Sequence, residues 1–210
     1  TELYDRGDQA TTAEKAARKA ISESLVITVR LIKAIDSDEI DELIESLLTR
    51  FGIDLHYADL VKPWLNTMLH SPLDRHSKTD QLSLSQLTSQ MKKVEMEFYF
   101  PVEKLNADDF NQLLKSYPCL QVPANDLDFY QLKGMLKGFI DLTFEWQGQF
   151  YILDYKSNHL GNEFSEYDQM AMEQAMAEHR YDVQMVLYTL ALHRLLSLRL
   201  NDYDYDTHIG

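Results

Sequence analysis

The chain has 210 residues, of which 34 are Asp or Glu and 20 are Lys or Arg, so its formal net charge is −14 at pH 7. Hydrophobic residues at 45% and charged residues at 26% exclude a disordered or collagen-like chain, and no apolar run reaches the roughly 18 residues of a membrane span. An acidic balance of this size argues against a surface that holds nucleic acid by charge alone. The single cysteine, Cys119, and an opening sequence without an apolar signal region lead us to expect a cytoplasmic protein.

The first third of the chain is predicted to be helical. Residues 1–40 form a helical segment of unclear role, whose last residues begin an amphipathic helix predicted over 36–52 from apolar positions at helical spacing. A second helix is expected over 59–70, where Pro63 is tolerated if it falls in the first turn. The following stretch, 71–90, is rich in Ser and Gln and is predicted to be a surface loop that includes a short helical piece.

The spacing of the apolar residues then changes from that of a helix to every second residue. Val94, Met96, Phe98 and Phe100 alternate with polar residues until Pro101, which predicts a strand with one buried face that ends there. A short helix is expected to start at Asn106 and to be followed by a connection over 118–128. Its predicted core-facing residues are Phe110, Leu113, Leu114 and Tyr117.

The C-terminal half predicts a hairpin followed by helices. Two strands, 131–145 and 149–156, flank a turn, and two helices are expected over 165–200 with an interruption near 179–181. The last ten residues alternate Asp and Tyr, as an incipient strand does. Together these elements predict an α/β domain with a small mixed sheet flanked by helices.

Two acidic residues lie inside the hydrophobic strands of this hairpin. A turn centred on Gln147-Gly148 places Asp141 directly opposite Asp154, with their Cβ atoms about 5 Å apart. Such like charges destabilise a sheet unless a positive group lies between them, and strand alternation puts Lys156 on the same face as Asp154. Carboxylate oxygens suit Mg²⁺, so the pattern predicts a divalent-metal site. The alternative is a surface hairpin in which Asp154 simply pairs with Lys156.

Long motifs around these charges carry a family resemblance. The segments GMLKGFIDLTF, YILDYKSNHLG and HRYDVQMVLYTLALHR resemble the nuclease domains of RecB-type subunits of helicase–nuclease complexes, members of the PD-(D/E)xK superfamily. The resemblance extends from about Trp64 to the last residue. It implies a restriction-endonuclease-like core over 41–210 and hydrolysis of DNA phosphodiester bonds in double-strand break repair and recombination. The cofactor implied is Mg²⁺, with Mn²⁺ as a substitute.

The resemblance also implies a role for each matching residue. Asp141 and Asp154 are the metal-binding aspartates, the backbone carbonyl of Tyr155 is a further ligand, and Lys156 is the catalytic lysine. The upstream segment VEMEFYFP is similar to the first acidic strand of the family. Glu95 fits that acid because it stands three residues before a Phe, and Glu97 on the same strand is a second candidate.

Three further residues are predicted to lie near DNA. Gln184 and Tyr188 match a family pair spaced Q-x-x-x-Y, and at i and i+4 they share one helix face. Lys137, next to Gly138, is placed to meet a phosphate where glycine lets the backbone approach closely. The alternative for Lys137 is the solvated face of a twisted strand.

The chain departs from the family pattern in two respects. A histidine that joins the family's metal site from a G-x-x-x-H helix has no match here, since His56 and His70 lie in different surroundings. Family domains also continue into a further strand, so we expect a fragment that is truncated at its C-terminal end. The implied partners are DNA and the RecC-like and RecD-like subunits of a heterotrimer. The alternative function is a catalytically silent nuclease-fold module that docks partner subunits.

Overall fold

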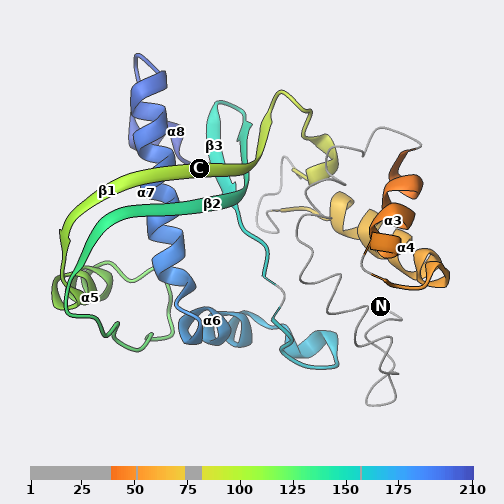
Figure 1. Ribbon diagram of the computed structural model, residues 1–210, viewed down its shortest axis with the longest axis horizontal. Coiled ribbons are helices and arrows are strands. Elements are labelled where there is room, and N and C mark those ends of the chain that lie inside the picture. Colours follow the sequence, from red (N-terminus) through yellow and green to blue (C-terminus); the bar gives the residue numbers. More distant parts are fainter. Residues whose placement is uncertain (1–38, 51, 74–81, 157) are drawn as a thin grey trace. The chain divides into compact units, whose positions relative to one another are not determined.

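The computed structural model describes residues 39–50, 52–73, 82–156 and 158–210 (Figure 1). Two compact units result: the first contains the residues up to 95 with 141–145 and 154–157, and the second contains the remainder. The predicted helical segment before residue 39 lies outside the described residues. No helix in the described ranges is both long enough and apolar enough to cross a membrane.

Helices α3 (Glu39–Arg50) and α4 (Ala58–His70) form the core of the first unit, joined by the short η1 (Leu55–Tyr57). Gly52 ends α3 in a left-handed conformation with φ +68, and the Ile53 N–H donates to the Leu48 carbonyl at 2.8 Å. The buried contact joins Ile44, Leu47 and Leu48 to Ala58, Val61 and Leu65. Both predicted helices are therefore confirmed within the described residues.

Pro63 is placed differently from the expectation. It is the sixth residue of α4, beyond the first turn, so a backbone N–H that would bond to the Asp59 carbonyl is missing inside the helix. The buried leucines Leu65 and Leu69 on the core side of α4 supply packing that offsets this loss.

The predicted surface loop after α4 contains the expected short helical piece, but its surface position is partly wrong. Residues 74–81 lie outside the described residues, but Leu82, Leu84 and Leu87 are buried around the short η2 (Leu84–Gln86). The Gln86 side chain accepts a hydrogen bond from the Ser83 N–H at 2.8 Å, which satisfies a backbone group at this turn. Three leucines among many polar residues thus bring this segment into the core.

Three antiparallel strands form a sheet in the order β1-β2-β3: β1 (Lys92–Leu105), β2 (Leu132–Trp146) and β3 (Gln149–Leu153). β1 runs past Pro101, contrary to the prediction, because an edge strand tolerates a residue that cannot donate to the ladder. The turn between β2 and β3 is Gln147-Gly148, with φ of +51 and +81. Positive φ at both turn residues matches the twist of a tight hairpin and confirms the predicted turn.

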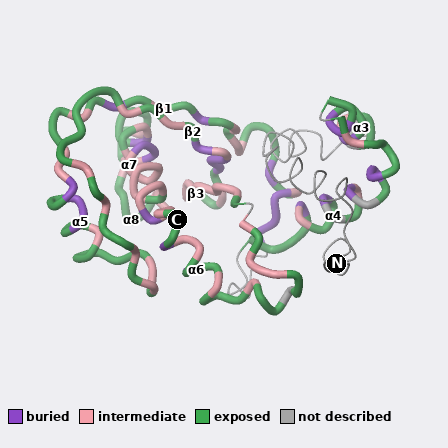
Figure 2. The backbone as a smooth tube through the Cα atoms, turned by 60° about the horizontal axis from the view of Figure 1, so that its bottom comes forward, coloured by how far each residue is buried: buried purple, intermediate pink, exposed green. Residues whose placement is uncertain are grey.

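In the second unit α7 (Tyr181–Arg199) lies across one face of β1 and β2 (Figure 1). Met96, Phe100 and Ile140 of the strands are buried against Ala191, Leu192 and Leu196 of the helix. Figure 2 shows the outer stretches of β1 and β2 mostly as exposed, while buried segments lie along α7. The sheet of this unit therefore has one packed face and one open face.

The remaining helices of the second unit are η3 (Phe164–Glu166), α5 (Ala107–Ser116), α6 (Gln169–Glu178) and α8 (Tyr205–His208). The break between α6 and α7 falls at Arg180, as predicted, where φ is +54. The predicted C-terminal strand is wrong: residues 205–208 form one helical turn because Asp204 caps it by accepting from the Thr207 N–H at 2.9 Å. Only Ile209 makes a strand-like contact in the described C-terminal residues, a parallel bridge to Phe150.

The expected core face of α5 is only partly correct. Phe110 is buried, but Leu113 and Tyr117 are exposed, and the polar Asn111 is buried instead. Asn111 makes two hydrogen bonds to the backbone of Leu127: its Nδ2 donates to the carbonyl and its Oδ1 accepts from the N–H, both at 2.9 Å. This amide holds the connection after α5 in place.

Replacing the buried Asn111 with Ala removes the hydrogen-bond partners of the N–H and carbonyl of the half-buried Leu127. We expect the free energy of unfolding to fall by about 2–4 kcal/mol, as measured by urea denaturation. The neighbouring exposed Gln112→Ala change should stay within about 0.5 kcal/mol of the unsubstituted chain. Equal stability of the two variants would contradict the role assigned to Asn111.

Candidate metal centre

Asp141 lies on β2 between two fully buried residues, Ile140 and Leu142. The two-residue turn pairs Trp146 with Gln149, so Asp141, five residues before Trp146, stands opposite the residue five places after Gln149. That residue is Asp154. The hairpin register thus brings the two predicted metal-binding aspartates together.

Asp154 and Lys156 follow directly after the end of β3 at Leu153. The predicted strand over 149–156 is therefore three residues too long, yet the two charged side chains still meet in an ion pair. The Asp154 side chain is 18% exposed and that of Lys156 is 30% exposed, so the pair is largely shielded from water. Lys156 lies beside the aspartate that the sequence assigned to it.

Tyr155 contributes a contact that the sequence did not predict. Its backbone N–H donates to Oδ2 of Asp141 at 3.0 Å, which orients that carboxylate. Its phenol oxygen is buried and has no hydrogen-bond partner among the described residues. Burial, followed by the charge of Asp141, raises the pKa of this phenol. The sequence signal for this backbone contact is the position of Tyr155 between Asp154 and Lys156, two residues that the sequence assigned to the site.

The electrostatics of the pair fit a bound cation. Burial raises the pKa of Asp141 above its ordinary value, and the charge of Asp154 and a hydrogen bond with it raise the pKa further. Oδ2 of Asp154 is a buried oxygen, and its charge partner among the described residues is the Lys156 ammonium. Two carboxylates against one ammonium leave a net negative charge, which a divalent cation with oxygen preference would neutralise.

The upstream glutamates are not gathered with these aspartates. The hydrogen bond from the Glu145 N–H to the Met91 carbonyl, 2.8 Å, sets a register in which Glu95 stands opposite Asp141. The backbone at Glu95 is left-handed, with φ +48, so its exposed side chain does not follow the strand alternation. Within the described ranges no group of three acidic, His or Cys side chains is placed to hold a metal.

Glu97, the second upstream candidate, is engaged elsewhere. Its Oε1 lies 2.6 Å from Nζ of Lys137 and accepts a hydrogen bond from the Tyr99 hydroxyl at 2.6 Å. The Lys137 contact, followed by the Tyr99 hydroxyl, lowers the pKa of Glu97. Lys137 is accordingly ion-paired on the open face of β1 and β2 and belongs to the second unit.

Gln184 and Tyr188 form the predicted pair on one face of α7. The Gln184 amide donates to the Tyr188 hydroxyl at 2.7 Å, and the Tyr188 ring packs edge-on against Phe98 at a centroid distance of 5.7 Å. Both residues belong to the second unit. Their part in substrate binding stays a prediction.

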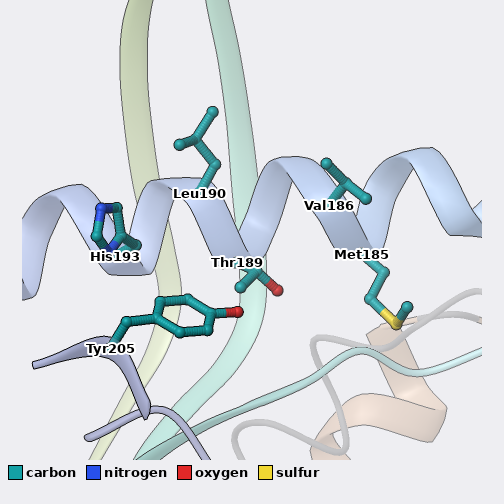
Figure 3. Close-up of a pocket in the computed structure, with 6 residues that line it drawn as sticks. All are labelled: Met185, Val186, Thr189, Leu190, His193 and Tyr205. Carbon is teal, nitrogen blue, oxygen red and sulfur yellow. The ribbon is translucent and has the colours of Figure 1, made fainter. Parts of the chain in front are cut away.

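A groove beside α7 and α8 has a volume of about 400 Å³ (Figure 3). Its lining, as far as the described residues show, contains no carboxylate, so its chemistry differs from that of the aspartate pair. Its lining residues are Met185, Val186, Thr189, Leu190, His193 and Tyr205.

Comparison with known families agrees with this geometry. A family model described as the PD-(D/E)XK nuclease superfamily matches residues 13–202. The chain therefore belongs to this superfamily, whose members generally use divalent metal ions.

Within the superfamily, the chain is similar to RecB subunits of RecBCD enzymes. The chain is 46% identical over 160 residues to the RecBCD enzyme subunit RecB of Escherichia coli (strain K12), an alignment that covers 76% of this chain and 13% of that protein. It is 36% identical over 176 residues to RecB of Haemophilus influenzae, covering 83% of this chain and 14% of the relative. The chain thus spans about one seventh of the length of these relatives and is homologous to their nuclease region.

The raised pKa of Asp141 predicts a stability effect with a definite sign. Because the folded state holds the Asp141 proton more tightly than the unfolded state, ionisation lowers stability as the pH rises above the ordinary value of 3.8. Without metal at neutral pH, Asp141→Asn should therefore raise the free energy of unfolding, by about 1 kcal/mol or less.

This gain should shrink as the pH is lowered toward the ordinary carboxyl pKa of 3.8, because Asp141 of the unsubstituted chain gains its proton in that direction. Thermal unfolding in EDTA across this pH range measures both effects. A variant that is less stable than the unsubstituted chain at neutral pH would contradict the like-charge account of the pair.

Proposed function

We propose that this chain is a Mg²⁺-dependent deoxyribonuclease domain that hydrolyses phosphodiester bonds. The observation that carries the proposal is the opposed pair of Asp141 and Asp154 with Lys156 beside it, in a chain of the PD-(D/E)XK nuclease superfamily. A metal bound by such carboxylates polarises a phosphate and lowers the pKa of bound water. Mn²⁺ is expected to substitute for Mg²⁺.

Each residue of the site has a proposed role that follows from its contacts. Asp141 and Asp154 supply the ligand oxygens, and the Tyr155 N–H fixes the orientation of the Asp141 carboxylate. Lys156, held by Asp154, provides a positive charge and a donor toward the attacking water and the phosphate. The Tyr155 carbonyl and Glu95 are proposed as additional ligands, and Glu95 requires a change of its side-chain orientation to reach the pair.

The relatives suggest the biological setting. We propose that the chain acts within a RecBCD-type complex together with RecC-like and RecD-like subunits, on single- and double-stranded DNA, in double-strand break repair and recombination. Such a complex is expected in the cytoplasm. Exonuclease and endonuclease modes both agree with a two-carboxylate site, since neither requires a covalent intermediate.

A catalytically silent docking module is the second candidate. The observation that favours it is the lack, among the described residues, of a third acidic, His or Cys side chain beside the two aspartates. A silent module has no use for two half-buried, opposed carboxylates that destabilise the sheet, so we favour the enzyme.

Replacement of Asp154 by Asn separates the two candidates. It keeps the shape of the side chain and removes the charge that the metal needs, so we expect cleavage of single-stranded DNA in Mg²⁺ to fall about 100-fold or more. Gel analysis of labelled DNA measures the rate. The control is Asp108→Asn, an exposed aspartate in the first turn of α5, which should cleave at the unsubstituted rate.

Unchanged cleavage by Asp154→Asn would overturn the assignment of the site. Cleavage by neither the unsubstituted chain nor the Asp108→Asn control would favour the docking module.

A further inference from the structure

The open face of β1 and β2 carries large apolar side chains that remain exposed. Tyr99 is 55% exposed, Phe139 48% and Met135 65%. Strand alternation puts them on the face opposite to Phe100 and Ile140, which are buried against α7. Most exposed apolar residues occur singly on protein surfaces, so a group of this kind on one sheet face calls for an explanation.

Two of these rings enclose a lysine. Nζ of Lys137 lies 5.2 Å from the centroid of the Tyr99 ring and 5.0 Å from that of Phe139. Glu97 holds the same ammonium at 2.6 Å and accepts from the Tyr99 hydroxyl. We call Glu97, Tyr99, Lys137 and Phe139 the Tyr99 cluster. All four residues lie in the second unit, so the cluster is a local feature of one sheet face.

Close packing on the other face fixes the strands that carry the cluster. A Cβ at Gly138 would lie 2.3 Å from the Phe98 ring, so glycine is required for that ring to lie over β2. The Phe98 ring in turn stacks on Phe100 and contacts Tyr188 of α7. The backbone that presents Lys137 and Phe139 is therefore held by aromatic packing from behind.

The chemistry of the Tyr99 cluster fits unpaired nucleotides. Single-stranded DNA is bound by exposed aromatic rings on which bases stack, combined with cations that meet the backbone. The cores of protein–protein interfaces are instead depleted of charge, whereas here each ring lies about 5 Å from an ammonium. Bases in a duplex are already stacked and do not offer their faces to such rings.

We propose that the Tyr99 cluster is a binding site for single-stranded DNA, with bases stacked on Tyr99 and Phe139 and a phosphate at Lys137. The inference rests on the proposed function for its ligand class, and it assigns residues that the catalytic account does not use. Phe139 stands two residues before Asp141 on β2, so the Tyr99 cluster and the proposed metal ligands share one strand.

Glu97 limits the affinity of this site. The Glu97 contact and the Tyr99 hydroxyl raise the pKa of Lys137, so the lysine stays charged but is partly neutralised by the carboxylate. A phosphate must compete with Glu97 for the ammonium. In a chain with a net charge of −14, binding should therefore depend on stacking more than on charge, and should weaken with salt.

Fluorescence anisotropy of a labelled oligothymidylate in EDTA and low salt tests the site without cleavage. Tyr99→Ala and Phe139→Ala should each weaken binding by about fivefold or more, because each removes a stacking ring. Tyr99→Phe keeps the ring and should retain the affinity. Glu97→Gln should strengthen binding and steepen the dependence on salt by about one unit of slope, because Lys137 becomes free for a phosphate.

The control is Met170→Ala, which should leave binding unchanged. Met170 lies on α6 and is 71% exposed. Equal affinities of Tyr99→Ala, Phe139→Ala and Met170→Ala would overturn the site, as would the absence of binding by the unsubstituted chain. Equal weakening by Tyr99→Phe and Tyr99→Ala would contradict stacking.

The proposed function is separable in the same assay. Asp154→Asn should bind the oligothymidylate like the unsubstituted chain and fail to cleave it in Mg²⁺. The predicted binding pattern without any cleavage would retain the Tyr99 cluster and reject the nuclease. Cleavage without the binding pattern would retain the nuclease and reject the cluster.

Discussion

The burial of two like charges opposite one another governs the structure around β2 and β3. Asp141 lies on β2 between the fully buried Ile140 and Leu142, which fix the strand at this point, and the Tyr155 N–H holds its half-buried carboxylate. The tight turn at Gln147-Gly148 fixes the register that places Asp154 against it. The two carboxylates repel each other, and the Lys156 ammonium balances only one of their two negative charges. A bound divalent cation would neutralise the remaining charge.

The same long strands have two different faces in the second unit. The inner face packs on α7 through Met96, Phe100 and Ile140, which makes the strands rigid. The outer face leaves Tyr99 and Phe139 open around Lys137. Because the chain is acidic overall, a face on which a lysine is held between aromatic rings is a physically reasonable place for contact with a nucleic acid. The net charge is therefore compatible with the DNA binding that we propose, and it limits the part that charge plays there.

Sequence reasoning located the strand hairpin because its signals are local. A two-residue turn, alternating apolar residues and the positions of Asp141 and Asp154 determine the pairing without knowledge of the rest of the fold. Strand alternation also put Lys156 beside Asp154, and the family motifs implied its catalytic role. The left-handed backbone at Glu95 could not be predicted, since nothing in the residue type requires φ +48, and alternation alone would have directed this side chain toward the pair.

Errors elsewhere arose where tertiary contacts outweigh local pattern. The burial of Asn111 depends on the backbone of Leu127, which lies outside α5, so the periodicity of that helix does not indicate it. Pro101 was expected to end β1, but the position of that strand at the sheet edge, a property of the whole sheet, makes proline acceptable.

Isothermal titration calorimetry of Mg²⁺ and Mn²⁺ into the chain tests most directly whether the aspartate pair is a metal site. The account predicts saturable binding at one site at millimolar metal or below by the unsubstituted chain, and loss of that heat in Asp141→Asn and in Asp154→Asn. Identical titration curves for the unsubstituted chain and both variants would contradict it.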